Sequence, residues 1–290
     1  MPKKRLYSVP LRDMWKEYHE WCQKNKQTDA HVFYNQKLKE VLSCPFPLVQ
    51  HTRRIELIFW LMDYQKEFLH IYLEAPELYE VIKAIQLKDL QAIKQYLQDT
   101  GVKKQFLVPS TGQILDTVFY NIAVHVPNHI DSFTYSFFYL PDGGVILHFE
   151  KDGKIGAISE QAYEDSTIRT DEAAKTEVQN FNFAVNLLTY MRCFPECVKD
   201  GVPEDNKDKL YIPQGQSIQL GASDKMQEII RDTTGQKRPH YRTGYFKTLT
   251  SDFYTHKKGQ VIFVRETMVN AKAKTVVLSD DEEKLDKYTK

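Results

Sequence analysis

The chain has few of the features that mark secreted, membrane-bound or disulfide-rich proteins. Its four cysteines, at positions 22, 44, 193 and 197 of 290, are too few and too scattered for a disulfide framework. The most apolar segment, Ile55–Met62, is about half as long as the ~18 residues of a membrane span. The N-terminal residues also lack the apolar run of a secretory signal. We therefore expect a soluble, cytoplasmic protein with no membrane partner.

Motifs for several kinds of catalysis are missing as well. The chain contains no GxxxxGK[ST] loop, no GxGxxG after a strand and no GxSxG elbow, so nucleotide hydrolysis, dinucleotide chemistry and hydrolase-elbow catalysis have no support. Cys193 and Cys197 are four residues apart, but no second Cys or His pair follows at zinc-finger distance. His125 and His129 lie on either side of Pro127 without a nearby acid or cysteine, which favours surface histidines over ligands. We expect no metal and no other cofactor.

Helical patterns dominate the first third of the chain. With 42 % hydrophobic and 12 % aromatic residues, extensive disorder is excluded, and the length allows one large domain or two small ones. Apolar residues recur at helical spacing from Leu11, which predicts an amphipathic helix whose aromatic stripe packs in a core. We predict helices over Leu11–Lys26, His51–Phe68, Pro76–Ile85 and Lys88–Gln98, the last capped by Gly101.

The pattern then changes to strands and one long helix. Aromatic and β-branched residues predict an antiparallel meander over Thr117–Val126, Ser132–Leu140, Val145–Glu150 and Lys154–Ser159, with a turn at residues 141–144. Thr170 is a suitable N-cap for a following helix, which has an apolar face and stops before Pro195. These elements predict an α+β fold: a helical N-terminal third, an antiparallel meander, a long packing helix and a C-terminal basic hairpin.

Composition divides the chain into five regions. We expect a helical N-terminal region over residues 1–100, and a sheet with its packing helix over 101–200. The polar segment Gly201–Gln216 indicates a loop or linker, placed at residues 201–222. A short helix over Ser223–Asp232 and the basic hairpin occupy residues 223–278. An acidic tail follows over 279–290, and it is either solvated or folded back on the basic face.

The basic charge is concentrated near the C-terminus. Nine Lys/Arg and two acids lie between Lys237 and Lys274, so this segment has a charge of +7 (nine minus two) in a chain whose formal net charge is +0. A concentrated basic face attracts polyanions or acidic peptides. Aromatic rings lie between the cations and are suited to stacking on bases or on guanidinium groups.

Backbone-directing residues mark the same segment. Pro239 stiffens Arg238-Pro239-His240, and Gly244 allows a tight turn or a close backbone approach. Val261–Arg265 and Ala273–Leu278 are predicted strands. A hairpin whose charges are merely solvated is the alternative to a binding surface.

The residues of this segment resemble a family of proteins from phages and plasmids. The run R-P-H-x-R-x-G at Arg238–Gly244, the aromatic pair that follows, and the V-x-F-V-R strand ending in Met268-Val269-Asn270 are similar to the C-terminal signature of that family. One of its members inhibits type V-A CRISPR systems. The family usually has His-Trp after the glycine, where this chain has Tyr245-Phe246, so a stacking role is retained and an imidazole role is not.

The resemblance implies a function and a set of binding residues. The family member recognises the beginning of the nascent effector nuclease and lowers its production through loss of its mRNA. The partners implied here are a CRISPR effector nuclease or its nascent chain, with mRNA or the ribosome as further possibilities, in a bacterial cytoplasm. Arg238, His240, Arg242 and Arg265 would make polar contacts and Tyr245 and Phe246 would be stacking platforms; Lys247 and Lys257 complete the partner-binding set.

Two other classes of function use the same residues. A general RNA- or DNA-binding accessory protein needs only the basic face. A metal-independent ribonuclease needs a histidine as general base or acid beside a cation, and His240 and His256 with Arg242 and Lys257 supply those groups. Binding requires no matched pKa values, so we favour a binding protein over an enzyme.

Overall fold

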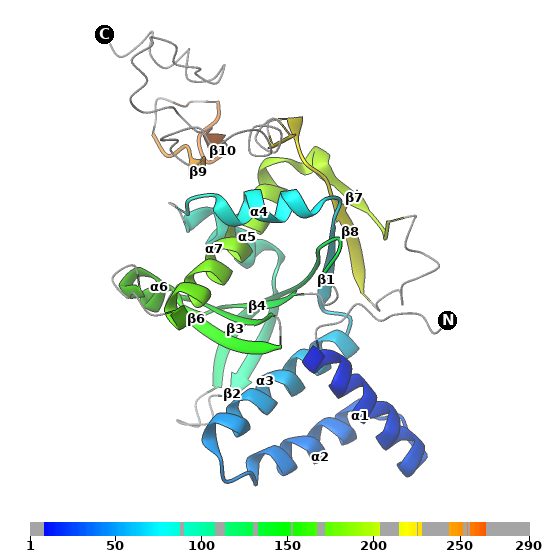
Figure 1. Ribbon diagram of the computed structural model, residues 1–290. Coiled ribbons are helices and arrows are strands. Elements are labelled where there is room, and N and C mark those ends of the chain that lie inside the picture. Colours follow the sequence, from blue (N-terminus) through cyan, green and yellow to red (C-terminus); the bar gives the residue numbers. More distant parts are fainter. Residues whose placement is uncertain are drawn as a thin grey trace, which may run out of the picture.

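The computed structural model describes most of the chain as a layered arrangement of helices around one sheet (Figure 1). The described residues are 9–87, 90–107, 114–129, 133–151, 153–166, 172–203, 215–224, 226–227, 244–251, 254 and 256–264. None of the helices within these residues is long and apolar enough to cross a bilayer.

Three helices form a layer on one face of the sheet: α1 (Val9–Asn25), α2 (Ala30–Leu42) and α3 (Pro47–Tyr64). Asp29 caps α2 by accepting hydrogen bonds from the backbone N–H groups of His31 and Val32, and a proline begins α3. The helices meet around Trp60, which is fully buried and lies 4.8 Å from Phe33 and 5.0 Å from Tyr18 between ring centroids. Aromatic packing therefore holds this layer together.

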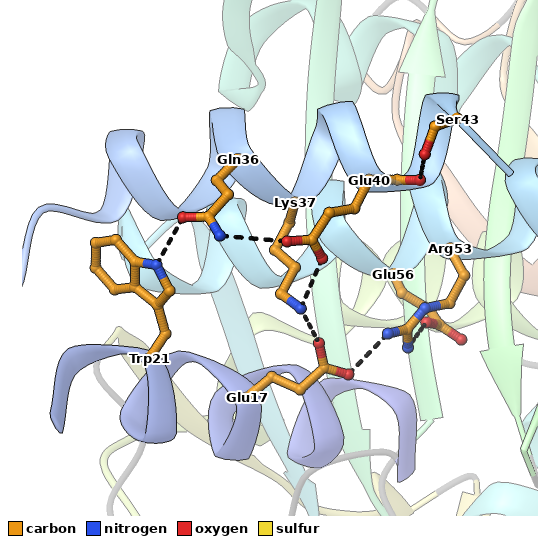
Figure 2. A network of polar contacts seen from close by, with 8 residues as sticks. All are labelled: Glu17, Trp21, Gln36, Lys37, Glu40, Ser43, Arg53 and Glu56. Atoms are coloured by element: carbon orange, nitrogen blue, oxygen red, sulfur yellow. Dashed lines mark hydrogen bonds and ion pairs between the residues drawn. The ribbon is translucent and has the colours of Figure 1, made fainter. Parts of the chain in front are cut away.

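A polar network links the same three helices at the edge of their aromatic core (Figure 2). Glu17 of α1 accepts a hydrogen bond from Arg53 of α3 at 2.7 Å and forms an ion pair with Lys37 of α2 at 3.1 Å. Burial alone would raise the pKa of the Glu17 carboxyl, but the hydrogen bonds and charges of Arg53 and Lys37 outweigh it and lower this pKa. The carboxylate therefore remains ionised and joins three elements.

The sheet has eight strands in the order β6-β5-β4-β3-β1-β8-β7, with β2 paired to β3 beside β1. The strands β2 to β6 form an antiparallel meander, whereas β1 is parallel to both β3 and β8. Their bounds are β1 Phe68–Leu73, β2 Val102–Leu107, β3 Ile114–His125, β4 Phe133–Tyr139, β5 Val145–Lys151, β6 Lys154–Ser159, β7 Val198–Asp200 and β8 Gln216–Leu220. Three segments far apart in sequence thus meet at the centre of the sheet.

The second face of the sheet is covered by α4 (Pro76–Ala84), α5 (Gln91–Thr100) and α7 (Glu172–Cys193), with the short α6 (Glu160–Ser166) beside them. The largest hydrophobic cluster lies here, and α7 contributes Phe181, Val185 and Leu188 to it, all fully buried. A 3-10 turn, Pro195–Cys197, follows α7. A separate two-stranded sheet, β9 (Tyr245–Thr248) and β10 (Val261–Val264), packs on the C-terminal part of α7.

The predicted α+β class is confirmed, and so are most of the predicted helices and the antiparallel meander. Gly101 ends α5 as expected, but with φ −74° and not in the left-handed conformation. A Cβ there would lie 2.2 Å from Val118 Cγ1, so the glycine is needed for a close approach to β3.

Several boundaries differ from the prediction. The helix predicted over His51–Phe68 ends at Tyr64, and Phe68 begins β1. Helix α2, the short helix α6 and the strands β1, β2, β7 and β8 were not predicted, and β8 (Gln216–Leu220) lies inside the loop or linker predicted over residues 201–222. The Thr170 cap, the predicted strand over residues 273–278 and the acidic tail lie outside the described residues.

Candidate functional site

The predicted partner-binding residues are partly within the described chain. Tyr245, Phe246 and Lys247 lie on β9, and Lys257 lies in the connection between β9 and β10. Four other predicted contacts, Arg238, His240, Arg242 and Arg265, lie outside the described residues. The partner of β10 is β9, a strand that the sequence did not predict, paired so that Phe246 faces Phe263 and Lys247 faces Ile262.

Phe246 is a core residue, which corrects its predicted role as a stacking platform. Only 6 % of Phe246 is exposed, and its ring centroid lies 5.3 Å from that of Phe263, which is also buried. Both residues belong to the main hydrophobic cluster of the sheet. The aromatic ring therefore anchors the hairpin and is not available to a base or a peptide. Tyr245, on the opposite side of β9, is half-buried and keeps part of its surface at the solvent.

Backbone contacts fix the hairpin to the rest of the molecule. The N–H of Gln86 donates to the carbonyl of Gly244 at 3.1 Å, and the Cys193 thiol donates to the carbonyl of Val261 at 3.2 Å. A Cβ on Gly244 would lie 2.5 Å from Phe263 Cζ, so this position requires the close backbone approach that the sequence suggested. The hairpin is thus positioned by α7 and by the segment after α4.

Cationic side chains lie on the outer side of this anchored hairpin. Lys247 is exposed on the side of β9 opposite to Phe246, and His256, Lys257 and Lys258 are exposed in the connection that turns at Gly259, where φ is +83°. Lysine ammonium groups bind phosphate and carboxylate as point charges. The described part of the predicted site is therefore a hairpin anchored in the core, with basic groups at its surface.

A second cluster, which the sequence did not reveal, lies inside the molecule. His70 of β1 and His125 of β3 are buried, and His70 Nδ1 lies 3.1 Å from His125 Nε2. Asp63 Oδ1 lies 3.6 Å from His70 Nε2, and Asp63 Oδ2 accepts a hydrogen bond from Trp15 at 2.8 Å. His125 was expected at the surface with His129; only His129 is exposed. The residue that His125 contacts is His70, which is distant in sequence and becomes a neighbour only through the parallel pairing of β1 and β3.

Burial sets the protonation of His125. Burial, together with the charge of His70, lowers the pKa of His125 well below its usual value, so His125 is neutral. Its Nε2 shares a hydrogen bond with His70 Nδ1, in which the donor depends on the tautomers of the two rings. His125 Nδ1 has no hydrogen-bond partner within the described structure. The arrangement is a buried imidazole pair in line with the Asp63 carboxyl group.

Other polar groups share this face of the sheet, the face towards α1–α3. By strand register, Asn121, Thr134 and Ser136 project to the same side as His70, and all three are buried. The Ser136 hydroxyl donates to Asn121 Oδ1, while Thr134 Oγ1 and Asn121 Nδ2 have no hydrogen-bond partner in the part of the chain described. Buried polar atoms of this kind are normally satisfied by water or a ligand. This face of the sheet therefore carries a cluster of buried polar side chains, apart from the basic hairpin.

The cysteines serve the packing of the hairpin and of the sheet edge. Cys193 contacts β10, whereas Cys197 is buried at the 3-10 turn, where burial raises the pKa of its thiol. Within the described residues, no three His, Cys, Asp or Glu side chains are arranged to hold a metal ion. Both cysteines therefore have structural surroundings.

Comparison with known proteins gives no further assignment. No protein-family model, no curated protein and no solved structure matches the chain.

Proposed function

We propose that the chain is a binding protein that uses the basic side of the β9–β10 hairpin to hold an anionic partner, and that it counters bacterial immunity in the host cytoplasm. The observation that carries this proposal is the division of β9 into two sides. Phe246 is in the core and Lys247 is exposed one residue later, so the strand is fixed to the fold while its charge faces outwards. A fixed cation loses less conformational freedom on binding than one on a mobile chain.

The resemblance supports a specific partner. In the phage and plasmid family, the signature segment belongs to a protein that recognises the beginning of a nascent type V-A effector nuclease. The retained residues Arg238, Arg242 and Gly244 match that signature, and Gly244 has the packing role that its position requires. We therefore propose the N-terminal peptide of such a nuclease as the partner, and loss of its mRNA as the consequence. Single-stranded RNA is the alternative ligand.

Binding assays with two probes test the proposal. Fluorescence anisotropy would compare a labelled N-terminal peptide of a type V-A effector nuclease with a labelled single-stranded RNA. Lys247→Ala with Lys257→Ala, and separately Arg238→Ala with Arg242→Ala, should weaken binding at least about tenfold, because each removes charge-assisted hydrogen bonds. The matched control is Lys16→Ala with Lys24→Ala, which removes two exposed cations from α1 and should leave binding unchanged.

The salt dependence distinguishes the two ligands. If the partner is RNA, each lost phosphate contact should reduce the slope of log K against log salt by about 1. If the partner is the peptide, binding should depend on peptide sequence and only weakly on salt. Equal weakening by the control pair, or a lower melting temperature that accounts for the loss, would overturn the proposal. Cleavage of the RNA by purified protein would instead favour the nuclease that uses His240 and His256.

A further inference from the structure

A cleft on the α4–α7 side of the sheet lies apart from the basic hairpin. It has a volume of about 220 Å³ and forms where α4, the β5–β6 connection and the first half of α7 meet. Tyr79 and Lys83 come from α4, Lys151 and Lys154 from β5 and β6, and Thr176 and Gln179 from α7. Neither hairpin strand contributes to its described lining.

The described lining of the cleft is basic. Among the described residues that line it, three are lysines and none is acidic. Lys83 pairs with Glu80 of the same helix at 3.8 Å, and the Glu80 side chain is 67 % exposed, so water screens this pair strongly. Three ammonium groups around one small volume repel one another, and an anion placed between them relieves that repulsion.

The structure holds one of these ammonium groups in place. Lys151 Nζ lies 4.7 Å from the ring centroid of Phe133 and 5.1 Å from that of Tyr79, and it donates a hydrogen bond to the Tyr79 hydroxyl. Contacts with aromatic faces hold a cation in a defined place. Lys151 is therefore a positioned charge at the wall of the cleft.

Polar groups complete the lining. Asn180 is buried at the floor, where its amide donates to the carbonyl of Thr176 at 2.9 Å and accepts from the Tyr135 hydroxyl at 3.1 Å. The floor is thus fixed by its own hydrogen bonds. Thr176 and Gln179 are exposed at the rim, and the Gln179 amide supplies a neutral donor for an oxygen of a bound anion.

From this geometry we propose that the cleft binds the phosphate group of a small molecule through Lys83, Lys151 and Lys154. A phosphate monoester carries a charge of about −1.5 to −2 at neutral pH and three acceptor oxygens, which suits several separate ammonium donors better than a single carboxylate does. The cleft is smaller than the roughly 300 Å³ at which pockets for drug-sized ligands begin. The ligand is consequently free phosphate or a compact phosphorylated molecule.

Isothermal titration of the full chain with inorganic phosphate, pyrophosphate and AMP tests the assignment, with adenosine and matched sodium chloride as controls. Saturable binding of the phosphates and none of adenosine is expected. Lys154→Met keeps the apolar stem and removes the charge, and it should weaken phosphate binding about tenfold. Lys175→Met is the matched control: Lys175 lies on α7 and pairs with Glu172 at 2.7 Å, outside the cleft, so its loss should change nothing.

A second pair of variants tests the other charge at the wall of the cleft. Lys151→Met should also weaken binding, while Lys103→Met, at an exposed lysine of β2 outside the cleft, should not. Because Lys151 packs against aromatic rings, its variant is interpreted only if its melting temperature is unchanged; otherwise the exposed Lys154 decides the outcome. AMP binding tighter than inorganic phosphate indicates an organic phosphate, and equal affinity indicates free phosphate. Absence of saturation at 10 mM (on the order of a very weak site), or equal effects of Lys154→Met and Lys175→Met, would overturn the proposal.

Discussion

His125 shows how a single buried residue gives the molecule a dependence on pH. Its contacts within the described residues include His70 at 3.1 Å and Tyr72, stacked at 4.3 Å between ring centroids, and Asp63 lies beyond His70. Burial and the charge of His70 hold the pKa of His125 well below 6.5. An unfolded histidine titrates near 6.5, so below about pH 6.5 the unfolded chain binds a proton that the folded chain does not.

Stability should therefore fall as the solution is acidified. Above about pH 6.5 the residue is neutral in both states and contributes no pH dependence. Below it, one such group lowers the free energy of unfolding by up to about 1.4 kcal/mol per pH unit. Urea unfolding at a series of pH values between 7.5 and 5 would measure this slope.

Two variants test whether His125 is the source. His125→Gln keeps a donor near the Nε2 position and cannot titrate, so its stability should fall less steeply with acid. His31→Gln removes an exposed histidine on α2 and should leave the slope of the natural protein intact. An undiminished slope in His125→Gln would assign the acid sensitivity to groups other than His125.

At the scale of elements, we predict that the polar network of Figure 2 stabilises the packing of the three N-terminal helices. Glu17 is half-buried and contacts both neighbouring helices, whereas Glu20, almost one turn later on α1, pairs with Lys16 at 4.0 Å, with side chains 65 % and 76 % exposed. Glu17→Gln should lower the free energy of unfolding by about 1 kcal/mol, near the upper end for partly exposed ion pairs.

Glu20→Gln is the matched control and should have no measurable effect, because water screens an exposed pair of this length. Denaturant unfolding of the two variants at pH 7 makes the comparison. The sign is fixed by the lowered pKa of Glu17: its contribution is present above the pKa of an unfolded glutamate and is lost as the pH falls through the folded value. Equal free energies of unfolding in both variants would mean that the network adds no measurable stability to the aromatic packing.

Elements with a clear period were the ones that could be predicted from the sequence. The helices α1 and α4 bury one side against a core, so their periodicity is visible, and β3 to β6 are recognisable as runs of aromatic and β-branched residues bounded by turn residues. Strand β1 is covered on both faces and shows no alternation; the predicted helix reached only its first residue, Phe68, and the strand itself was not predicted. The hairpin strand β10 was predicted, but its partner β9 is short and alternates a buried Phe246 with an exposed Lys247.

The candidate sites, too, could be predicted from the sequence only where a local pattern marks them. The concentration of basic charge near the C-terminus is a property of composition, so the sequence reveals it without any fold. The His70–His125 pair and the lysine-lined cleft depend on which strands and helices become neighbours. Lys83 and Lys154 are about 70 positions apart in the chain and meet only because α4 packs beside the β5–β6 connection. No local pattern encodes such proximity.

At the scale of the whole molecule, the parallel insertion of β1 joins regions that composition alone would separate. A boundary was predicted near residue 100, yet β1 lies between β3 and β8 in one sheet. The core of the N-terminal helices contains residues of the sheet, since Phe68, Phe119 and Phe138 pack in the same cluster as Trp15 and Trp60. The helical layer and the sheet therefore share buried apolar surface.

We predict from this shared core that the helices and the sheet unfold in one cooperative transition. All three tryptophans, Trp15, Trp21 and Trp60, lie in the α1–α3 layer, so their fluorescence reports that layer alone. Far-UV circular dichroism reports the backbone of every element. The two signals should give the same urea midpoint.

Phe138→Ala, a change on β4 within the sheet, should lower both midpoints together. The free energy of unfolding should fall by a few kcal/mol, because the cavity that the variant leaves lies between the layers. Fluorescence and circular dichroism midpoints that separate, with the variant moving only one of them, would instead establish two independently folding regions divided near residue 100.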